Sequence, residues 1–590
     1  MVNSYIIDKL IKYAIIYTQH NIKSFYFYSE NNFNYTASYR DNNYLKGVFA
    51  MRMARALLDY LKLNNVDLVF GIPSSTVSAI FDELCDANIK TIITKNEAGA
   101  VYSASRYSSA SNKMGVCVLA GGVGVNNAVN GIADAMRNKI PLLIISGHVQ
   151  RWQIGKGAIH EQDTEYILKP ITKYSHTVMA EDIVLNSLKE AIEIALTPPM
   201  GPVHVSIPLD IQMMEYNASL PEEAQYYQKY LTPNNNQDIR RACTIINKSE
   251  NGIILVGKGC KGYSEKVMEL SRRLQWPIIT TPQAKGLIPY NFPLSLGNYG
   301  FGGTDLANRY VENSNSSCLL ILGSSLGETV TKNYSSTFTE GRKVIHIDQD
   351  EMQINKIYRA DVGISADLKL VIPSLLELTN KSNTIFKKSE AFNDPYVKNH
   401  FGLSLRLFFE KITSILPQNT FYVCDIGEYM NFALKYTQIP QDGSFDINMN
   451  YGATGTGVGG AVGIQLAFQN RPVAVFCGDG SFFMNGNEIF TAKEYKLPII
   501  YFIVNNSMLG YVQHGQMYMY GRALKNYCNQ RVSISSMMNA AGVRSFEIRS
   551  IDELNRIPEL IRNLHGPCVI ELITNGSEPA PIAHRFQKFK

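Results

Sequence analysis

The sequence lacks the features typical of disulfide-rich, secreted, membrane and nucleic-acid-binding proteins. Its nine cysteines include no Cys-x-x-Cys pair, and Cys117, Cys477 and Cys568 lie in apolar segments, so we expect reduced cysteines in protein cores. We find no signal peptide and no apolar run long enough to cross a bilayer, so we expect a cytoplasmic protein without a membrane partner. The net charge of +5 is small for 590 residues, and cations are mixed with carboxylates, so no nucleic-acid partner is expected.

Apolar strands alternate with helical patterns in three blocks of the chain, as parallel sheets require. We expect an α/β fold with three doubly wound domains at residues 49–213, 239–378 and 395–578, joined by polar linkers at 214–238 and 379–394. The clearest strands are expected at 66–70, 115–119, 141–145, 202–206, 252–256, 277–280, 318–322, 343–347, 471–477 and 498–504.

The two ends of the chain lie outside these blocks. Residues 579–590 are expected to form a C-terminal tail, and residues 1–48 an N-terminal extension. Residues 5–16 have helical apolar spacing, which would suit a helix that docks a partner or caps an oligomer. We favour the simpler interpretation, a packed or partly ordered extension.

The most informative segment is Gly478-Asp479-Gly480-Ser481, which follows the apolar run at 471–477 and predicts a buried strand that ends in a tight turn. A helical pattern follows at 485–495, and the next apolar strand ends at Asn505-Asn506. Open α/β sheets bind ligands at the carboxyl ends of their strands. Carboxylate and amide oxygens there suit Mg²⁺, and glycines let backbone amides approach phosphate groups. A Gly-Asp-Gly alone is an ordinary turn, but this arrangement predicts a magnesium-diphosphate clamp.

The clamp resembles the thiamine diphosphate motif of decarboxylases and carboligases. A second stretch, from Lys95 to Val149, resembles the pyrimidine-binding domain of acetolactate synthase. The resemblance covers about residues 49 to 578, and on it the chain is identified as a member of the acetolactate-synthase-like thiamine diphosphate superfamily. It implies that the first domain binds the pyrimidine ring of the cofactor, that the central one is nucleotide-binding-like, and that the last binds the diphosphate.

The resemblance also implies a role for each matching residue. Glu97 stands at the catalytic glutamate, which protonates the pyrimidine ring; the alternative is a surface carboxylate at a helix N-terminus. The metal ligands would be Asp479, the side chain of Asn506 and the backbone carbonyl of Met508. Further cofactor-binding residues would be Gly452, Thr454, Gly478, Gly480, Ser481, Leu509 and Gly510.

Several positions on the acceptor side depart from acetolactate synthase. Ser325 and Thr329 stand where that family has arginines that bind the acceptor's carboxylate. His160 lies in a replaced Phe-Gln-Glu run, and it is a candidate catalytic proton donor or acceptor, or a spacer bonded to backbone. Phe301-Gly302 replace Met-His, and Gly515 replaces a tryptophan. The candidate substrate residues are Gly122, Ile159, His514 and Gly515.

Two further departures concern cofactors. Glu428 and Tyr429 replace a glutamine and a histidine near the diphosphate; because a second carboxylate there is unfavourable unless it turns away, Glu428 is not expected in the site. The central domain keeps segments that resemble a dinucleotide site, Gly257-Lys258-Gly259, Thr280-Thr281-Pro282 and His346-Ile347-Asp348. Since the arginine run is lost, we expect a vestigial or other-nucleotide site there in preference to an FAD site.

These residues lead us to expect an enzyme that uses thiamine diphosphate and Mg²⁺ to decarboxylate a 2-keto acid and ligate the product. We expect pyruvate as donor and an aldehyde or ketone without a carboxylate as acceptor. The alternatives are a plain decarboxylase or C–C lyase, acetolactate synthase proper, and a silent homologue that acts as a scaffold. The resemblance implies a homodimer or tetramer whose active sites lie between subunits.

Overall fold

The computed structural model describes residues 51–224, 236–388, 402–578 and 580–581. These described residues form one compact unit. The expected extension at 1–48, most of the expected tail and parts of both expected linkers lie outside the described residues.

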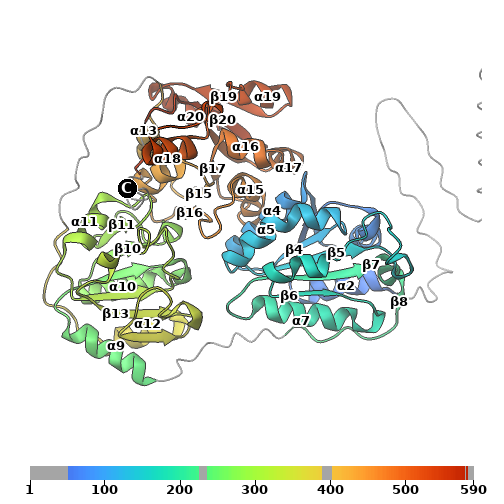
Figure 1. The fold of residues 1–590 in the computed structure, drawn as a ribbon, viewed down its shortest axis with the longest axis horizontal. Coiled ribbons are helices and arrows are strands. Elements are labelled where there is room, and N and C mark those ends of the chain that lie inside the picture. The colour runs from blue at the N-terminus through green and yellow to red at the C-terminus, as the bar shows by residue number, and fades with distance from the viewer. Residues whose placement is uncertain (1–50, 225–235, 389–401, 579, 582–590) are drawn as a thin grey trace, which may run out of the picture. The chain divides into compact units, whose positions relative to one another are not determined.

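The first domain is built on a six-stranded parallel sheet (Figure 1). Its spatial order is β3 (Lys90–Ile93), β2 (Leu68–Gly71), β4 (Gly115–Leu119), β5 (Leu142–His148), β7 (Pro202–Pro208) and β6 (Tyr174–Thr177). The helices that pack on it are α2 (Met53–Leu63), α3 (Ser78–Leu84), α4 (Glu97–Ser111), α5 (Val123–Arg137), α6 (Thr164–Leu168), α7 (Val184–Leu196) and α8 (Leu209–Met213). A short antiparallel pair, β1 (Met51–Arg52) with β8 (Glu215–Tyr216), joins its two ends.

The central domain has a six-stranded parallel sheet of a different order. Its strands run β11 (Ser295–Asn298), β10 (Ile278–Thr280), β9 (Gly252–Val256), β12 (Cys318–Leu322), β13 (Lys343–Asp348) and β14 (Val362–Ser365). The helices are α9 (Asn236–Lys248), α10 (Ser264–Leu274), α11 (Asp305–Asn313) and α12 (Leu368–Leu378). Counted along the domain, the order is that of dinucleotide-binding sheets, with its switch point between β9 and β12.

The third domain repeats the strand order of the first. Its strands run β16 (Ser444–Asp446), β15 (Phe421–Cys424), β17 (Val473–Gly478), β18 (Ile499–Asn505), β20 (Cys568–Ile573) and β19 (Arg544–Ile548). Its helices are α13 (Leu405–Ile415), α14 (Tyr429–Tyr436), α15 (Thr456–Ala467), α16 (Asp479–Asn485), α17 (Glu488–Glu494), α18 (Gly510–Tyr520), α19 (Ile534–Ala540) and α20 (Ile557–Leu560). The switch point of this order lies between β15 and β17.

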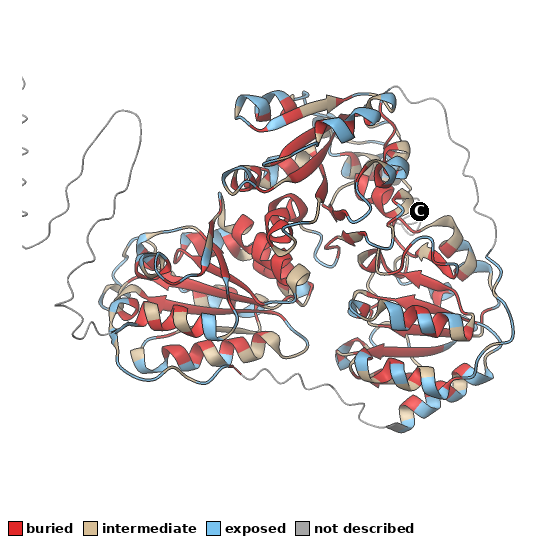
Figure 2. Ribbon diagram, turned by 180° about the vertical axis from the view of Figure 1, so that it is seen from behind, coloured by how far each residue is buried: buried red, intermediate tan, exposed pale blue. Residues whose placement is uncertain are grey.

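The expected fold class is confirmed, because all three sheets are parallel and carry buried apolar side chains on both faces. Figure 2 shows that the strands of these sheets are largely buried. In β4, for example, Cys117 and Leu119 belong to one core cluster while Val116 and Val118 belong to another, as the alternation of side chains along a strand dictates. The exact domain limits given above stay predictions.

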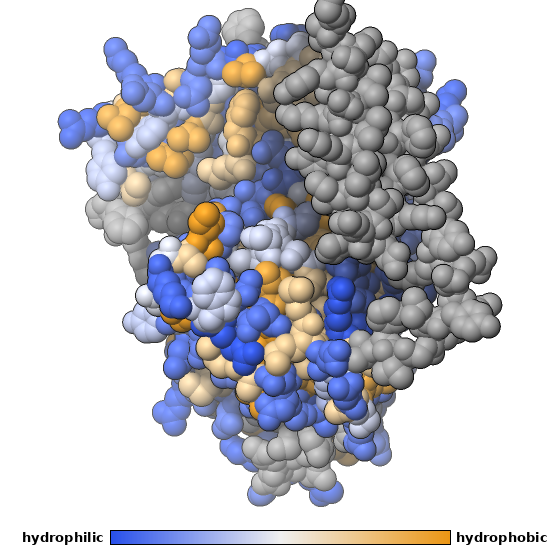
Figure 3. All heavy atoms as spheres, turned by 90° about the vertical axis from the view of Figure 1, so that its right-hand side faces the viewer, coloured by the Kyte–Doolittle hydropathy of each residue, from blue (hydrophilic) through white to orange (hydrophobic). Residues whose placement is uncertain are grey.

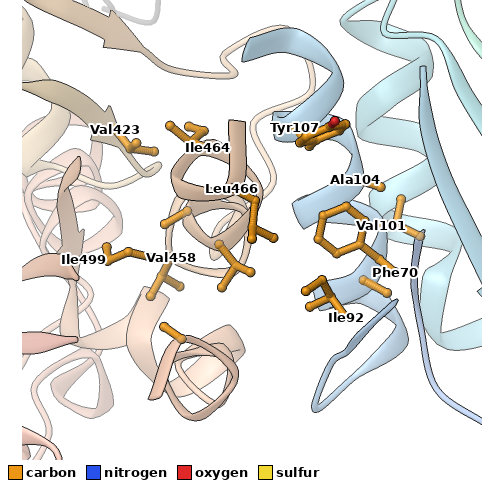
Figure 4. Packing of buried hydrophobic residues seen from close by; sticks show 14 of the residues in the cluster. Phe70, Ile92, Val101, Ala104, Tyr107, Val423, Val458, Ile464, Leu466 and Ile499 are labelled. Carbon is orange, nitrogen blue, oxygen red and sulfur yellow. The ribbon is translucent and has the colours of Figure 1, made fainter. Parts of the chain in front are cut away.

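One core cluster is shared by the first and third domains. In Figure 4, Val101, Ala104 and Tyr107 of α4 face Val458 and Leu466 of α15. The two helices approach closely because α15 is rich in glycine: a side chain at Gly463 would overlap the carbonyl of Ser103. The Ser103 hydroxyl donates to the carbonyl of Gly459 at 2.9 Å across this contact.

None of the described helices is long and apolar enough to cross a membrane. On the face drawn in Figure 3, apolar residues occur in small groups among polar ones. The described cysteines are all free, and seven of the nine are buried, as expected from their apolar neighbours.

Candidate active site

Asp479 and Asn506 lie together at the carboxyl ends of β17 and β18, which are paired in parallel. The Asp479 carboxylate accepts hydrogen bonds from the backbone N–H of Ser507 at 2.8 Å and of Gly480 at 2.7 Å. The side-chain oxygen of Asn506 accepts from the backbone N–H of Met508 at 3.1 Å. The expected meeting of one carboxylate and one amide oxygen is therefore present, and both are held by backbone donors.

The chemistry of these donors fits Mg²⁺. Burial raises the pKa of Asp479, although its two backbone hydrogen bonds and the charge of Arg531 act in the opposite direction. A divalent cation would stabilise the charged carboxylate, and oxygen atoms are the ligands that Mg²⁺ prefers. Leu509 packs near Gly480, and α18 begins at Gly510, so the expected cofactor-binding residues of this segment adjoin the two oxygen donors.

A carboxylate that sequence reasoning missed supports the turn that carries Gly452 and Thr454. Asp425, directly after β15, is buried and accepts hydrogen bonds from the backbone N–H groups of Gly455 at 2.8 Å, Gly457 at 3.0 Å and Val458 at 3.1 Å. It therefore fixes the N-terminus of α15. Gly452 has φ +77°, and a side chain there would meet no described atom within 4 Å, so its backbone faces open space.

Glu97 is the first residue of α4 and is half-buried. Its carboxylate accepts a hydrogen bond from the side chain of Asn127 at 3.0 Å, and its other oxygen would be 3.1 Å from a side-chain carbon at Gly124. The glycine-rich turn that opens α5 therefore lies against the expected catalytic glutamate. The catalytic role of Glu97 stays a prediction.

Glu488 of α17 joins the two halves of the site, and sequence reasoning missed it. Its carboxylate is buried and accepts hydrogen bonds from the backbone N–H groups of Lys95 at 3.1 Å and Asn96 at 3.0 Å. The hydroxyl of Thr491 donates a third, at 2.7 Å. Burial raises the pKa of Glu488 to about 7. The residues that precede Glu97 are thus bound to α17, the second helix after strand β17.

The loop that carries Ile159 and His160 is held by hydrogen bonds to the side chain of Glu161, which lies in the same loop. Glu161 accepts hydrogen bonds from the backbone N–H groups of Gly155, of Gly157 at 2.8 Å and of Ala158 at 3.0 Å, which lower its pKa. A side chain at Gly122 would meet the carbonyl oxygen of His160 at 2.6 Å, so the loop packs on the glycine-rich turn. Ile159 is 84% exposed. The structure therefore brings Gly122 and His160 together but leaves Ile159 at the surface.

Two groups of acceptor-side departures each lie near helix α14. The backbone N–H of Phe301 donates to the carbonyl of Thr329 at 2.8 Å, and a side chain at Gly302 would meet Leu434 of α14 at 2.6 Å. His514 and Gly515 lie on α18, and His514 Nδ1 is 2.6 Å from Oε1 of Glu428, which precedes α14. Helix α14 thus adjoins both groups.

Glu428, which was not expected in the site, lies close to Asn506. A side chain at Gly510 would overlap Oε2 of Glu428 and would meet the Asn506 amide nitrogen at 3.1 Å, so this carboxylate lies beside an expected metal ligand. Its other oxygen is turned onto His514. The neighbouring Tyr429 is buried, packs on Gly478, and has its hydroxyl 3.2 Å from that of Ser481.

In the central domain, the loops after β9 and β12 close on each other at the switch point. The backbone N–H of Gly259 donates to the carbonyl of Gly323 at 3.0 Å, and a side chain at Gly257 would overlap the same carbonyl. His346 Nε2 is 2.9 Å from the carbonyl oxygen of Ser324. Loop packing accounts for these glycines, and the preference for a vestigial or other-nucleotide site over FAD stays a prediction.

Comparison with known proteins gives matches along most of the chain. Residues 51–167 match the thiamine pyrophosphate enzyme N-terminal TPP binding domain, residues 239–375 the central domain, and residues 425–572 the C-terminal TPP binding domain. A probable acetolactate synthase large subunit of Methanocaldococcus jannaschii is 30% identical, over 90% of this chain and 93% of its own. The acetolactate synthase isozyme 2 large subunit of Escherichia coli is 27% identical, over 88% of this chain and 95% of its own. The chain therefore belongs to the thiamine pyrophosphate enzymes, in their acetolactate synthase-like group.

Proposed function

We propose that the chain decarboxylates a 2-keto acid and joins the remaining acyl unit to a second carbonyl compound, with thiamine diphosphate and Mg²⁺ as cofactors. The observation that carries the proposal is the position of Asp479 and Asn506 at the ends of two adjacent strands, on a domain that Glu488 connects to the residues before Glu97. When bound, thiamine diphosphate supplies the nucleophilic carbon and the electron sink that decarboxylation needs.

The clamp would bind the diphosphate end of the cofactor. Asp479, Asn506 and the backbone carbonyl of Met508 would bind Mg²⁺, which leaves positions for diphosphate oxygens. Gly478 and Gly480 let the backbone come close to those oxygens. Asp425 keeps the turn before α15 in place, so that the backbone of Gly452 stays free to bind the pyrimidine end.

Glu97 would exchange a proton with the pyrimidine ring. The Asn127 amide donates to one carboxylate oxygen at 3.0 Å and so fixes the orientation of the side chain. A catalytic carboxylate must be positioned before its pKa matters, because proton transfer requires hydrogen-bond distance. The loop with His160 packs on the turn that faces Glu97, which makes the imidazole our candidate for proton exchange with the substrate.

The first candidate acceptor is a second 2-keto acid, and the most direct product is acetolactate from two molecules of pyruvate. The names of the relatives support this candidate, since the chain aligns with acetolactate synthase large subunits over about nine tenths of its length. It is better supported than the acceptor without a carboxylate that the sequence alone favoured.

An aldehyde or ketone without a carboxylate is the second candidate. Ser325 and Thr329 replace the arginines that the family resemblance places there, and neither can form a charge-assisted fork with a carboxylate. Thr329 also uses its backbone carbonyl to hold Phe301. A plain decarboxylase would release the aldehyde instead of ligating it.

Assembly into a homodimer or tetramer and a cytoplasmic location belong to the same proposal. Since the hydrogen bond between Asn96 and Glu488 joins both parts of the site within one chain, sites between subunits stay a prediction of the family resemblance. The relatives are named as large subunits of their enzymes, which is compatible with an assembled protein. Nothing in the proposal requires a nucleic acid or a membrane.

The test of function combines binding and product analysis. The purified full chain is titrated with thiamine diphosphate and Mg²⁺ in a calorimeter, then incubated with pyruvate and a panel of aldehydes and keto acids, with products identified by mass spectrometry. We expect saturable binding, CO₂ release and a ligated product. The Glu97→Gln variant, which should bind the cofactor without turnover, is the matched control. Lack of cofactor binding by the wild-type chain would instead support a silent scaffold.

A further inference from the structure

Glu428 stands at the switch point of the third sheet, where open α/β sheets bind ligands. The loop after β15 leads from Asp425 to Glu428, and the loop after β17 carries the clamp. Tyr429 connects them, because its ring packs on Gly478 and its hydroxyl is 3.2 Å from that of Ser481. Glu428 is therefore held at the edge of the proposed diphosphate site by its own neighbour.

The carboxylate of Glu428 fills the place that a side chain at position 510 would take. A carbon built on Gly510 would overlap Oε2 of Glu428 and meet the Asn506 amide nitrogen at 3.1 Å. Only 9% of the Glu428 side chain is exposed. Together with Asp479, it would place two carboxylates near one diphosphate, and like charges at short range in a partly buried site oppose binding.

His514 supplies the compensating charge. It lies one helical turn after Gly510 on α18, so its ring reaches the same side of the helix. Its Nδ1 is 2.6 Å from Oε1 of Glu428, and this hydrogen bond raises the pKa of His514. In the related family, resemblance places a neutral glutamine at position 428. In this chain the negative Glu428 carboxylate and the positive His514 imidazolium together have no net charge, like the single neutral glutamine.

We propose that His514 and Glu428 form a charge-neutralising, positioning pair of the cofactor site. His514 holds the Glu428 carboxylate against Gly510 and cancels its charge, so that the clamp accepts Mg²⁺ and diphosphate. This inference rests on the proposed function, since the ligand of the pair is the diphosphate end of thiamine diphosphate.

The test is a double-mutant cycle on cofactor binding. The Kd of thiamine diphosphate is measured by calorimetry at fixed Mg²⁺ for the full-length wild type, His514→Gln, Glu428→Gln and the double variant. We expect His514→Gln to weaken binding roughly ten- to a hundredfold, because a buried carboxylate loses its charged partner. We expect Glu428→Gln in the His514→Gln background to restore most of this loss.

The controls separate charge from structure. Gln513 lies on the same helix, and the Gln513→Ala variant should bind the cofactor like the wild type. The far-ultraviolet circular dichroism spectra of all variants should match that of the wild type. Equal affinity of His514→Gln and wild type would overturn the pair, as would additive losses in the double variant, which indicate a merely structural role. If the wild-type chain binds no thiamine diphosphate, the proposed function is wrong, and the pair proposal is overturned with it.

Discussion

The buried carboxylate of Glu488 accepts a hydrogen bond from the backbone N–H of Asn96 at 3.0 Å. Asn96 also caps α4, since its side chain accepts from the backbone N–H of Ala98 at 2.8 Å. One side chain of the third domain therefore fixes the start of the helix on which Glu97 lies. The geometry of the proposed proton transfer therefore depends on Glu488, a residue of another domain.

The first prediction concerns pH and stability. The pKa of Glu488 is raised from 4.5 to about 7 in the folded protein, so the folded state holds a proton that the unfolded state has lost across this interval. Its contribution to stability is present below pH 4.5 and falls as pH rises through about 7, by at most about 3 kcal/mol. Glu488→Gln should lose this slope.

The measurement is urea unfolding of both proteins at several pH values between 4.5 and 8. We expect the stability of the wild type relative to Glu488→Gln to decrease over this interval and to level off above it. Asp82→Asn, which alters an exposed ion pair with Arg52, is the control and should follow the wild-type profile. Parallel profiles for wild type and Glu488→Gln would show that Glu488 is charged throughout.

The second prediction concerns Glu97. Glu97→Gln should keep the fold and most of the cofactor affinity but slow the exchange of the C2 proton of bound thiamine diphosphate by about a hundredfold or more, as expected for a lost general acid. NMR of the quenched exchange reaction measures this rate. Exchange at the wild-type rate would remove Glu97 from the mechanism.

The third prediction concerns the clamp. Asp479→Ala should lose Mg²⁺ and thiamine diphosphate together, because each supplies ligands or charge to the other. The thermal stabilisation that cofactor and metal give to the wild type should be absent in this variant. Chelation of Mg²⁺ from the wild type should release the cofactor, which equilibrium dialysis detects. Retention of full cofactor affinity by Asp479→Ala would place the metal elsewhere.

The fourth prediction concerns assembly. If sites form between subunits, a mixture of refolded Glu97→Gln and Asp479→Ala chains should regain about a quarter of the wild-type activity, since mixed dimers contain one intact site. Sedimentation should show the active species as a dimer or larger. No activity in the mixture, or a fully active monomer, would mean that Glu97 and Asp479 of the same chain act together.

The fifth prediction concerns the acceptor. A hydrogen bond to a charged group contributes about 1.5–3 kcal/mol. Compared with a chain that has arginines at positions 325 and 329, this chain should therefore have a kcat/KM for a keto-acid acceptor that is roughly ten- to a hundredfold lower. Thr329→Arg should increase the use of pyruvate as acceptor relative to an uncharged aldehyde. Another cation that could bind the acceptor's carboxylate in place of the arginines is Lys173, but its ammonium donates to the backbone carbonyls of Ile194 and, at 2.7 Å, Thr197. An unchanged acceptor ratio in Thr329→Arg would place the carboxylate elsewhere.

Most inner strands were predictable from sequence, whereas the edge strands and the inner strand β15 were not among those expected. The expected strands at 115–119, 252–256 and 318–322 agree with β4, β9 and β12, because buried parallel strands read as continuous apolar runs. The edge strands β6 and β16 contain polar residues, so they do not form continuous apolar runs. In β6, which reads Tyr-Ser-His-Thr, three of the four residues are polar. The helix expected at 485–495 is α17, which begins only at Glu488, after Gly486 and Asn487.

The candidate site was predictable where its residues follow strands. Asp479 and Asn506 meet because β17 and β18 are neighbours, which their patterns imply. Glu488 was missed, and the pairing of Glu428 with His514 was not foreseen, because the partners lie 392 residues apart for Glu488 and Asn96 and 86 residues apart for Glu428 and His514. No local sequence pattern indicates contacts over such separations. Asp425 could have been noticed, since it too directly follows an apolar strand.

The most direct test of carboligation is to follow uniformly ¹³C-labelled pyruvate by NMR with the holoenzyme and Mg²⁺. We expect labelled CO₂ together with a product that contains a new C–C bond, which is acetolactate when pyruvate is the sole carbonyl compound. Glu97→Gln should give neither. Acetaldehyde and CO₂ in equal amounts, with no ligated product from pyruvate or from any added aldehyde or ketone, would contradict carboligation and leave a plain decarboxylase.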